Sequence, residues 1–127
     1  MNGEYLIVDD EPDLCWALEH LLTSKGLPCQ IAQTAQAALD LMKAHRFQLA
    51  LLDVTLPDMN GLDLARSLRN LDPFLHIVIL SGYLSNEAAA VALARREGLI
   101  SAYFNKPFVH DEILQVIEDL TAKQAAR

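Results

Sequence analysis

Leu49-Ala50-Leu51-Leu52-Asp53 is an apolar run that ends in a single carboxylate. The apolar residues are continuous rather than alternating, which is typical of a parallel strand covered on both faces. The runs Tyr5-Leu6-Ile7-Val8 and Ile77-Val78-Ile79-Leu80 have the same character. The sequence therefore predicts three central parallel strands.

Weaker apolar patterns predict two edge strands and five helices. Alternating residues indicate less buried strands around Cys29 to Ile31 and around Ile100 to Phe104. Apolar positions spaced three and four residues apart indicate amphipathic helices. We expect these helices to begin near Pro12 and Ala35 and to span about residues 61–71, 86–96 and 111–121.

Strands that alternate with helices in this way predict a doubly wound α/β domain. Right-handed crossovers place helices on both faces of a parallel sheet. If the second and fifth strands are the edges, the five-stranded parallel sheet has the order 2-1-3-4-5, which is flavodoxin-like. We expect residues 1–122 to form this domain and residues 123–127 to be a C-terminal tail or the start of a linker.

The composition excludes several classes of function. Ten Lys and Arg against 17 Asp and Glu give a net charge of −7, with no basic run, so we expect no direct binding of nucleic acid. Every apolar run is shorter than the roughly 18 residues of a membrane span, and the N-terminus lacks the pattern of a signal peptide. We therefore expect a cytoplasmic protein without a membrane partner. Cys15 and Cys29 lack the spacing of a metal or redox motif and are predicted to be reduced core thiols.

Polar residues follow the predicted strands at the point where each strand ends. Those residues are Asp9-Asp10, Asp53, Ser81-Gly82 and Asn105-Lys106-Pro107. The carboxyl ends of parallel strands form one edge of a sheet, where doubly wound domains bind their ligands. Each residue alone has an ordinary explanation, such as a helix cap or a turn. Together, three carboxylates, a hydroxyl and an ammonium at one edge indicate a functional site.

The three carboxylates need a compensating charge. Like charges about 4 Å apart repel by roughly 4 kcal/mol at an effective dielectric constant of 20. Oxygen ligands with room for water suit Mg2+ and leave a position for a phosphate oxygen. Lys106 would then supply positive charge to a phosphoryl group, and Ser81 would supply a hydroxyl donor. Asp53, alone at its strand end, is the candidate nucleophile toward phosphorus. The chain has no Gly-rich phosphate loop, so nucleotide binding is not expected.

In their order along the chain, these residues resemble the receiver domain of bacterial two-component response regulators. The resemblance covers about residues 4–122. It includes Asp9-Asp10, Asp53, the turn Leu56-Pro57-Asp58-Met59-Asn60-Gly61, Ser81-Gly82-Tyr83 and Phe104-Asn105-Lys106-Pro107-Phe108. It implies a phosphoacceptor signalling domain that is not an enzyme, although it assists its own phosphorylation and dephosphorylation.

The resemblance also implies a role for each site residue. Asp53 would accept a phosphoryl group from a phosphohistidine of a sensor histidine kinase or a phosphotransfer protein. Asp9 and Asp10 would hold Mg2+ together with the Asp53 side chain and the backbone carbonyl of Thr55. Lys106 would pair first with the acceptor carboxylate and then with the phosphoryl oxygens.

Two further residues resemble the switch of the family. Ser81 would hydrogen-bond the phosphoryl group, and Tyr103 would rotate inward as Ser81 moves. An edge-strand tyrosine packed on a helix is the structural alternative for Tyr103. The bond before Pro107 resembles one that is cis in the family. The surface of the fourth helix, fifth strand and fifth helix would then control an output domain or an effector protein, and a phosphorylation-dependent dimer is compatible with the resemblance.

Two other classes of function share this chemistry or this fold. A phosphohydrolase of the haloacid dehalogenase type also forms an aspartyl phosphate, but its nucleophile lies in a D-x-D motif, and Asp53-Val54-Thr55 lacks the second acid. A flavin-binding module or a pseudo-receiver interaction module would have the same fold without phosphorylation. The complete acidic set disfavours both.

Overall fold

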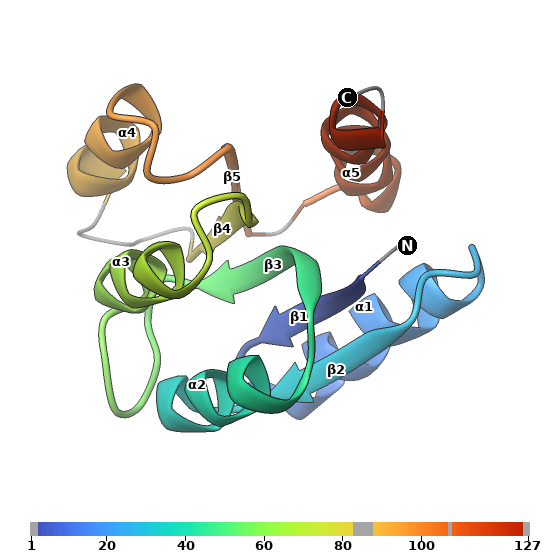
Figure 1. The fold of residues 1–127 in the computed structure, drawn as a ribbon, viewed down its shortest axis with the longest axis horizontal. Helices are drawn as coiled ribbons and strands as arrows, with labels where there is room; N and C mark the ends of the chain where they lie inside the picture. The colour runs from blue at the N-terminus through green and yellow to red at the C-terminus, as the bar shows by residue number, and fades with distance from the viewer. Residues whose placement is uncertain (1–2, 83–87, 107, 126–127) are drawn as a thin grey trace.

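The structure is a computed structural model that describes residues 3–82, 88–106 and 108–125. Within this described part of the chain, five strands alternate with five helices (Figure 1). The strands are β1 (Glu4–Val8), β2 (Cys29–Ala32), β3 (Phe47–Asp53), β4 (His76–Ser81) and β5 (Ala102–Asn105). The helices are α1 (Pro12–Thr23), α2 (Ala35–Ala44), α3 (Gly61–Leu71), α4 (Ala88–Arg96) and α5 (His110–Ala125).

The strands form one parallel sheet in the order β2-β1-β3-β4-β5. The predicted doubly wound, flavodoxin-like α/β fold is therefore confirmed. In the centre of the sheet, Leu52 of β3 lies opposite Val8 of β1 and Ile79 of β4. The polar residues that follow β1 and end β3 and β4 are consequently brought to one edge.

Each central strand is covered on both faces, which explains its continuous apolar run. Ala50 and Leu52 pack in the core beneath α2, α3 and α4, whereas Leu49 and Leu51 pack in the core beneath α1 and α5. All four side chains are fully buried. Figure 1 shows the same division, with α2, α3 and α4 toward the left and α1 and α5 toward the right. Successive side chains of a strand point to opposite faces of the sheet, so alternate residues of one strand enter two separate cores.

The edges of the fold differ slightly from the prediction. β5 begins at Ala102 rather than near Ile100, and its alternate residues are exposed as an edge strand requires. The fifth helix was predicted to end near residue 121, but α5 continues to Ala125, because the residues after 121 include alanines and glutamine, which favour helix, and no glycine or proline. The proposed domain boundary at residue 122 stays a prediction. The residues predicted to open the fourth helix lie outside the described part, and α4 is described from Ala88 onward.

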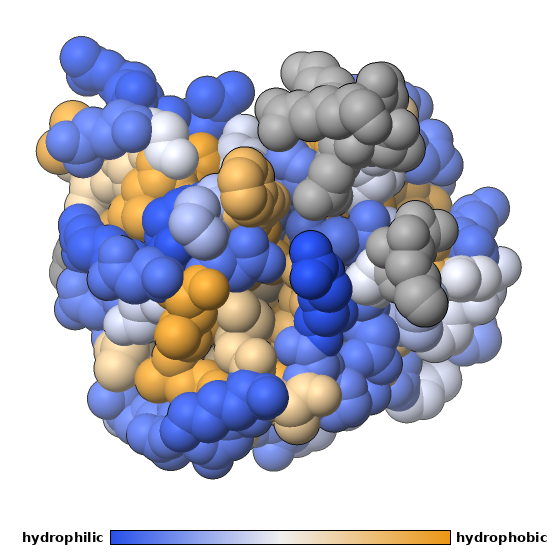
Figure 2. Space-filling model, viewed as in Figure 1, coloured by the Kyte–Doolittle hydropathy of each residue, from blue (hydrophilic) through white to orange (hydrophobic). Residues whose placement is uncertain are grey.

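Figure 2 shows a face that is mostly hydrophilic, with hydrophobic patches between the charged side chains. Among the described residues, no helix is long and apolar enough to cross a membrane.

Cys15 is buried and Cys29 is half-buried, and both are free thiols, as predicted. Burial raises the pKa of each thiol to about 11, so both stay protonated near neutral pH.

Candidate functional site

The carboxyl edge of the sheet brings the predicted polar residues together. β1 ends directly before Asp9, β3 ends with Asp53, and β4 ends with Ser81. The Lys106 backbone N–H donates to the carbonyl oxygen of Ser81 at 2.7 Å, which extends the β4–β5 pairing by one residue. The register of the sheet therefore places side chains from four separate segments at one edge.

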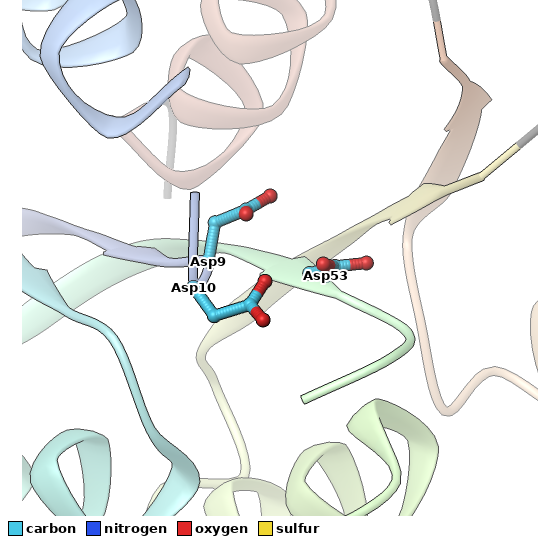
Figure 3. Close-up of side chains that lie close together, drawn as sticks. All are labelled: Asp9, Asp10 and Asp53. Atoms are coloured by element: carbon cyan, nitrogen blue, oxygen red, sulfur yellow. The ribbon is translucent and has the colours of Figure 1, made fainter. Parts of the chain in front are cut away.

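Asp9, Asp10 and Asp53 form a carboxylate cluster. One carboxylate oxygen from each lies within 4.8 Å of the other two. Figure 3 shows the three side chains close together beyond the ends of β1 and β3. Asp9 is fully buried and Asp53 is 5% exposed, whereas Asp10 faces solvent. Buried like charges at this separation need compensation from a cation or a proton.

Lys106 supplies the positive charge of the site. Its Nζ atom donates to Asp9 Oδ2 at 2.8 Å and to Glu11 Oε1 at 3.3 Å, and it lies 3.5 Å from Asp53 Oδ2. Burial of the ammonium acts to lower its pKa. The hydrogen bond and charge of Asp9, together with Asp53 and Glu11, outweigh burial and raise the pKa of Lys106 above its usual value. The side chain is therefore a permanent cation at neutral pH.

Asp53 is the least compensated of the buried carboxylates. Burial raises its pKa; the Thr55 N–H, which donates to Asp53 Oδ1 at 3.2 Å, opposes that shift. The charge of Asp9 raises the pKa further, and Lys106 lowers it. The net shift is upward, so the ionised form of Asp53 would gain from a further cation at this edge.

The loop after β3 holds Asp53 through close backbone packing. The chain turns back so that Thr55 and Asn60 form an antiparallel bridge, and the Gly61 N–H donates to the Val54 carbonyl at 2.7 Å. A Cβ atom on Gly61 would lie 2.2 Å from the Asp53 carbonyl oxygen and 2.7 Å from the Val54 Cα. Only glycine fits at this position without displacing the backbone of Asp53.

Asp58 connects the same loop to α2, which the sequence did not suggest. Its two carboxylate oxygens accept from the backbone N–H groups of Ala35 at 2.8 Å and Gln36 at 3.0 Å. The Thr34 hydroxyl accepts from the next N–H, that of Ala37, at 3.0 Å. A carboxylate at a helix N-terminus is also favoured by the helix dipole. The two backbone hydrogen bonds lower the pKa of Asp58. The residues next to Asp58 in the sequence do not indicate this contact, because they predict only a turn. Its partners lie 23 and 22 positions earlier.

Glu11 is a second residue that sequence reasoning missed. It directly follows the aspartate pair and precedes α1, and its Oε1 is the second carboxylate that contacts Lys106. The Glu11 N–H donates to Asp9 Oδ1 at 2.9 Å. The only sequence signal for this role is its place directly after Asp9-Asp10.

The remaining predicted residues lie around the cluster. Ser81 is buried, and its hydroxyl has a long contact of 3.5 Å to the Gly82 carbonyl. Tyr103 lies opposite Ile79 in the sheet and is 42% exposed, so its side chain is on the outside of the domain. Pro107 lies outside the described residues, and its cis bond stays a prediction, as does the role of the Thr55 carbonyl.

The donor set fits a hard divalent cation. Among the described residues, the Lys106 ammonium contacts Asp9, Glu11 and Asp53, and Asp10 lies beside two of these carboxylates, so one positive charge faces four negative ones. The donors of the Asp9, Asp10 and Asp53 cluster are all oxygens, and the exposure of Asp10 leaves one side open to water. Mg2+ prefers oxygen ligands and keeps several of its waters. The residues present therefore suit Mg2+.

Comparisons with known proteins place the chain in a family. The model of the family described as response regulator receiver domain matches residues 5–118. A response regulator receiver protein from Anaeromyxobacter sp. (strain Fw109-5) is 36% identical over 112 residues, which cover 88% of this chain and 46% of that protein. The DNA-binding transcriptional regulator NtrC from Proteus hauseri is 31% identical over 117 residues, which cover 92% of this chain and 24% of that protein. The chain thus spans less than half the length of either relative.

Solved structures resemble the chain over its whole length. The response regulator receiver domain protein (CheY-like) from Methanospirillum hungatei JF-1 superimposes with a TM-score of 0.87 at 30% identity, over 100% of both chains. The signal receiver domain of an HD domain-containing protein from Pseudomonas fluorescens Pf-5 has a TM-score of 0.89 at 25% identity, also over 100% of both chains. The fold is therefore shared with these proteins.

Proposed function

This chain belongs to the response regulator receiver domain family, and we propose that it is a phosphoacceptor signalling switch. In this proposal, Asp53 takes a phosphoryl group from a phosphohistidine of a partner sensor kinase or phosphotransfer protein. The observation that carries the proposal is the position of Asp53, which is nearly buried at the end of β3 beside two other aspartates and the Lys106 ammonium. The domain assists its own phosphorylation and dephosphorylation and is not an enzyme acting on a separate substrate.

The proposed step moves one phosphoryl group between two protein nucleophiles. A carboxylate oxygen of Asp53 forms a bond to phosphorus while the phosphorus–nitrogen bond to the partner imidazole breaks. The electron pair of that bond returns to the imidazole nitrogen, and Asp53 becomes an acyl phosphate. Lys106, 3.5 Å from the Asp53 carboxylate, is close enough to attract the phosphoryl oxygens as negative charge develops on them.

The proposed cofactor is Mg2+. The side chains of Asp9, Asp10 and Asp53 and the backbone carbonyl of Thr55 would hold it. When bound, the ion supplies positive charge to the phosphoryl oxygens. The Glu11 N–H bond to Asp9 fixes the orientation of that carboxylate before any ion arrives.

The proposed output is a change of surface on α4, β5 and α5. Phosphorylation adds about −1.5 to −2 charge at the end of β3. The Ser81 hydroxyl has a long contact of 3.5 Å to the Gly82 carbonyl, and it would turn from this contact to the phosphoryl group. Tyr103, exposed in the present structure, would rotate inward as Ser81 moves. Inverting a 1:99 population needs about 5.5 kcal/mol, which a few charge-assisted hydrogen bonds would supply.

The proposed partners follow from this output. Residues 1–122 would form the receiver domain, and residues 123–127 would be a tail or the start of a linker. The altered surface would control an output domain or an effector protein, or pair two phosphorylated copies. We propose that the domain works in the cytoplasm and that it does not itself contact nucleic acid or membrane, in keeping with its net charge of −7.

The proposal is tested by phosphorylation with acetyl phosphate, which replaces the partner kinase. Wild-type protein should gain one phosphoryl group, detected by intact-protein mass spectrometry, in the presence of Mg2+ and not in EDTA. Asp53→Asn should abolish this gain. Asp13→Asn is the matched control, because it removes one exposed acidic charge from the first turn of α1 and should be labelled as the wild type is.

Two results would contradict the proposal. If Asp53→Asn were labelled as strongly as the wild type, Asp53 would not be the acceptor. If the wild type instead released phosphate catalytically from many phosphomonoesters, the haloacid dehalogenase type of hydrolase would explain the site better.

A further inference from the structure

The Lys106 ammonium is shared unequally among three carboxylates. Its distance is 2.8 Å to Asp9, 3.3 Å to Glu11 and 3.5 Å to Asp53. A lysine ammonium has three N–H donors. Lys106 donates to Asp9 and Glu11, whereas Asp53 lies at ion-pair distance. Asp53, the proposed acceptor, is the most distant of the three.

The contact with Glu11 has no evident role in building the fold. Glu11 is the N-cap residue of α1, but its side chain makes no capping hydrogen bond. The Glu11 side chain is 64% exposed, whereas that of Lys106 is 18% exposed. A substitution that removes the Glu11 carboxylate therefore leaves the core and the helix cap intact and changes only the charge around Lys106.

We propose that Glu11 is a positioning residue that holds Lys106 away from Asp53 and slows phosphoryl uptake there. This inference rests on the proposed function. A phosphoryl transfer is accelerated only by interactions that are stronger in the transition state than in the ground state. The Glu11 contact stabilises Lys106 in the ground state. The ammonium must weaken this contact when it moves toward the phosphoryl oxygens, on which negative charge develops.

The expected effect is modest because Glu11 is exposed and its charge is screened. Glu11→Gln keeps the length of the side chain and removes its charge. We expect the rate of phosphorylation by acetyl phosphate to rise about two- to fivefold relative to the wild type, the range expected for an exposed ion pair. Asp13→Asn is the control for charge alone, because it removes a nearby exposed carboxylate for which no contact with Lys106 is found among the described residues. The increase should therefore be clearly smaller in Asp13→Asn.

A second measurement follows Lys106 without any phosphodonor or metal. The ammonium group of Lys106 gives a 15N-correlated NMR signal when its protons are protected by hydrogen bonds. Glu11→Gln should shift this signal, whereas Asp13→Asn should leave it in place. A mutation that only loosened the N-terminus of α1 would change backbone amide signals of the helix rather than the ammonium signal alone.

The outcomes separate the inference from the function on which it depends. Equal phosphorylation rates for Glu11→Gln and Asp13→Asn, or a slower rate for Glu11→Gln, would overturn the role of Glu11 while leaving the phosphoacceptor function intact. An unshifted Lys106 signal in Glu11→Gln would overturn it as well. If the wild type took no phosphoryl group at all, the proposed function would fail first, and the inference with it.

Discussion

Replacing Lys106 with methionine removes the charge that compensates Asp9 and keeps a side chain of similar length. Asp9 is fully buried, and the Lys106 ammonium lies 2.8 Å from its Oδ2 atom. At an effective dielectric constant of 20, this separation corresponds to an attraction of about 6 kcal/mol. Desolvation of the ammonium offsets part of this attraction, and breaking a buried ion pair by removing one partner costs about 3–5 kcal/mol. Because Lys106 is 18% exposed, we expect a loss near the lower limit, about 3 kcal/mol.

The loss is measured by urea unfolding at pH 7 in EDTA, with thermal unfolding as a second observable. The melting temperature should fall by about 10 °C. The matched control is Lys43→Met, since Lys43 is 73% exposed and lies 3.9 Å from Asp40. That variant should stay within about 0.5 kcal/mol of the wild type.

Mg2+ provides an internal check on the same variant. Adding it should restore more stability to Lys106→Met than to the wild type, because the ion then compensates carboxylates that have lost their ammonium. A loss of less than about 1 kcal/mol in EDTA would refute the view that Lys106 is the main charge compensation of the cluster.

Three more substitutions test the packing around the site. Gly61→Ala places a Cβ atom 2.2 Å from the Asp53 carbonyl oxygen and should lower the free energy of unfolding by about 3 kcal/mol in urea. Leu52→Ala, at a fully buried residue of β3, should lower it by about 2–5 kcal/mol in the same assay. Asp58→Asn should destabilise the protein at neutral pH. Because the pKa of Asp58 is lowered in the folded protein, its carboxylate stabilises the fold above the unfolded pKa of 3.8, and this stabilisation is lost as the pH falls through the folded pKa. The unfolding curves of the variant and the wild type should therefore converge in acid. A difference that persists unchanged at low pH would show that the helix cap at α2 does not depend on the carboxylate charge.

The central strands were predictable because a strand that is buried on both faces has apolar residues at consecutive positions. Leu49 to Leu52 and Ile77 to Leu80 are apolar without interruption, and each lies between two cores in the structure. The end of α5 was less predictable. Its apolar positions stop near residue 121, but a helix continues until the chain meets a residue that ends it.

The site was predictable to the extent that strand order determines it. Parallel strands bring their carboxyl ends to one edge, so Asp9, Asp53 and Lys106 had to lie near one another once the order 2-1-3-4-5 was assumed. The contacts of Glu11 and Asp58 depend on the path of two loops. Loop paths follow from tertiary packing and leave no periodic signal in the sequence, so these two residues were found only in the structure.

The most direct test of the central claim is to locate the phosphoryl group on the chain. Wild-type protein would be phosphorylated with acetyl phosphate and Mg2+, treated with borohydride to reduce the acyl phosphate, and digested for peptide mass spectrometry. We expect reduction to convert residue 53 from aspartate to homoserine and to leave Asp9 and Asp10 unchanged. Homoserine at position 9 or 10, or a modified peptide that does not contain residue 53, would contradict it.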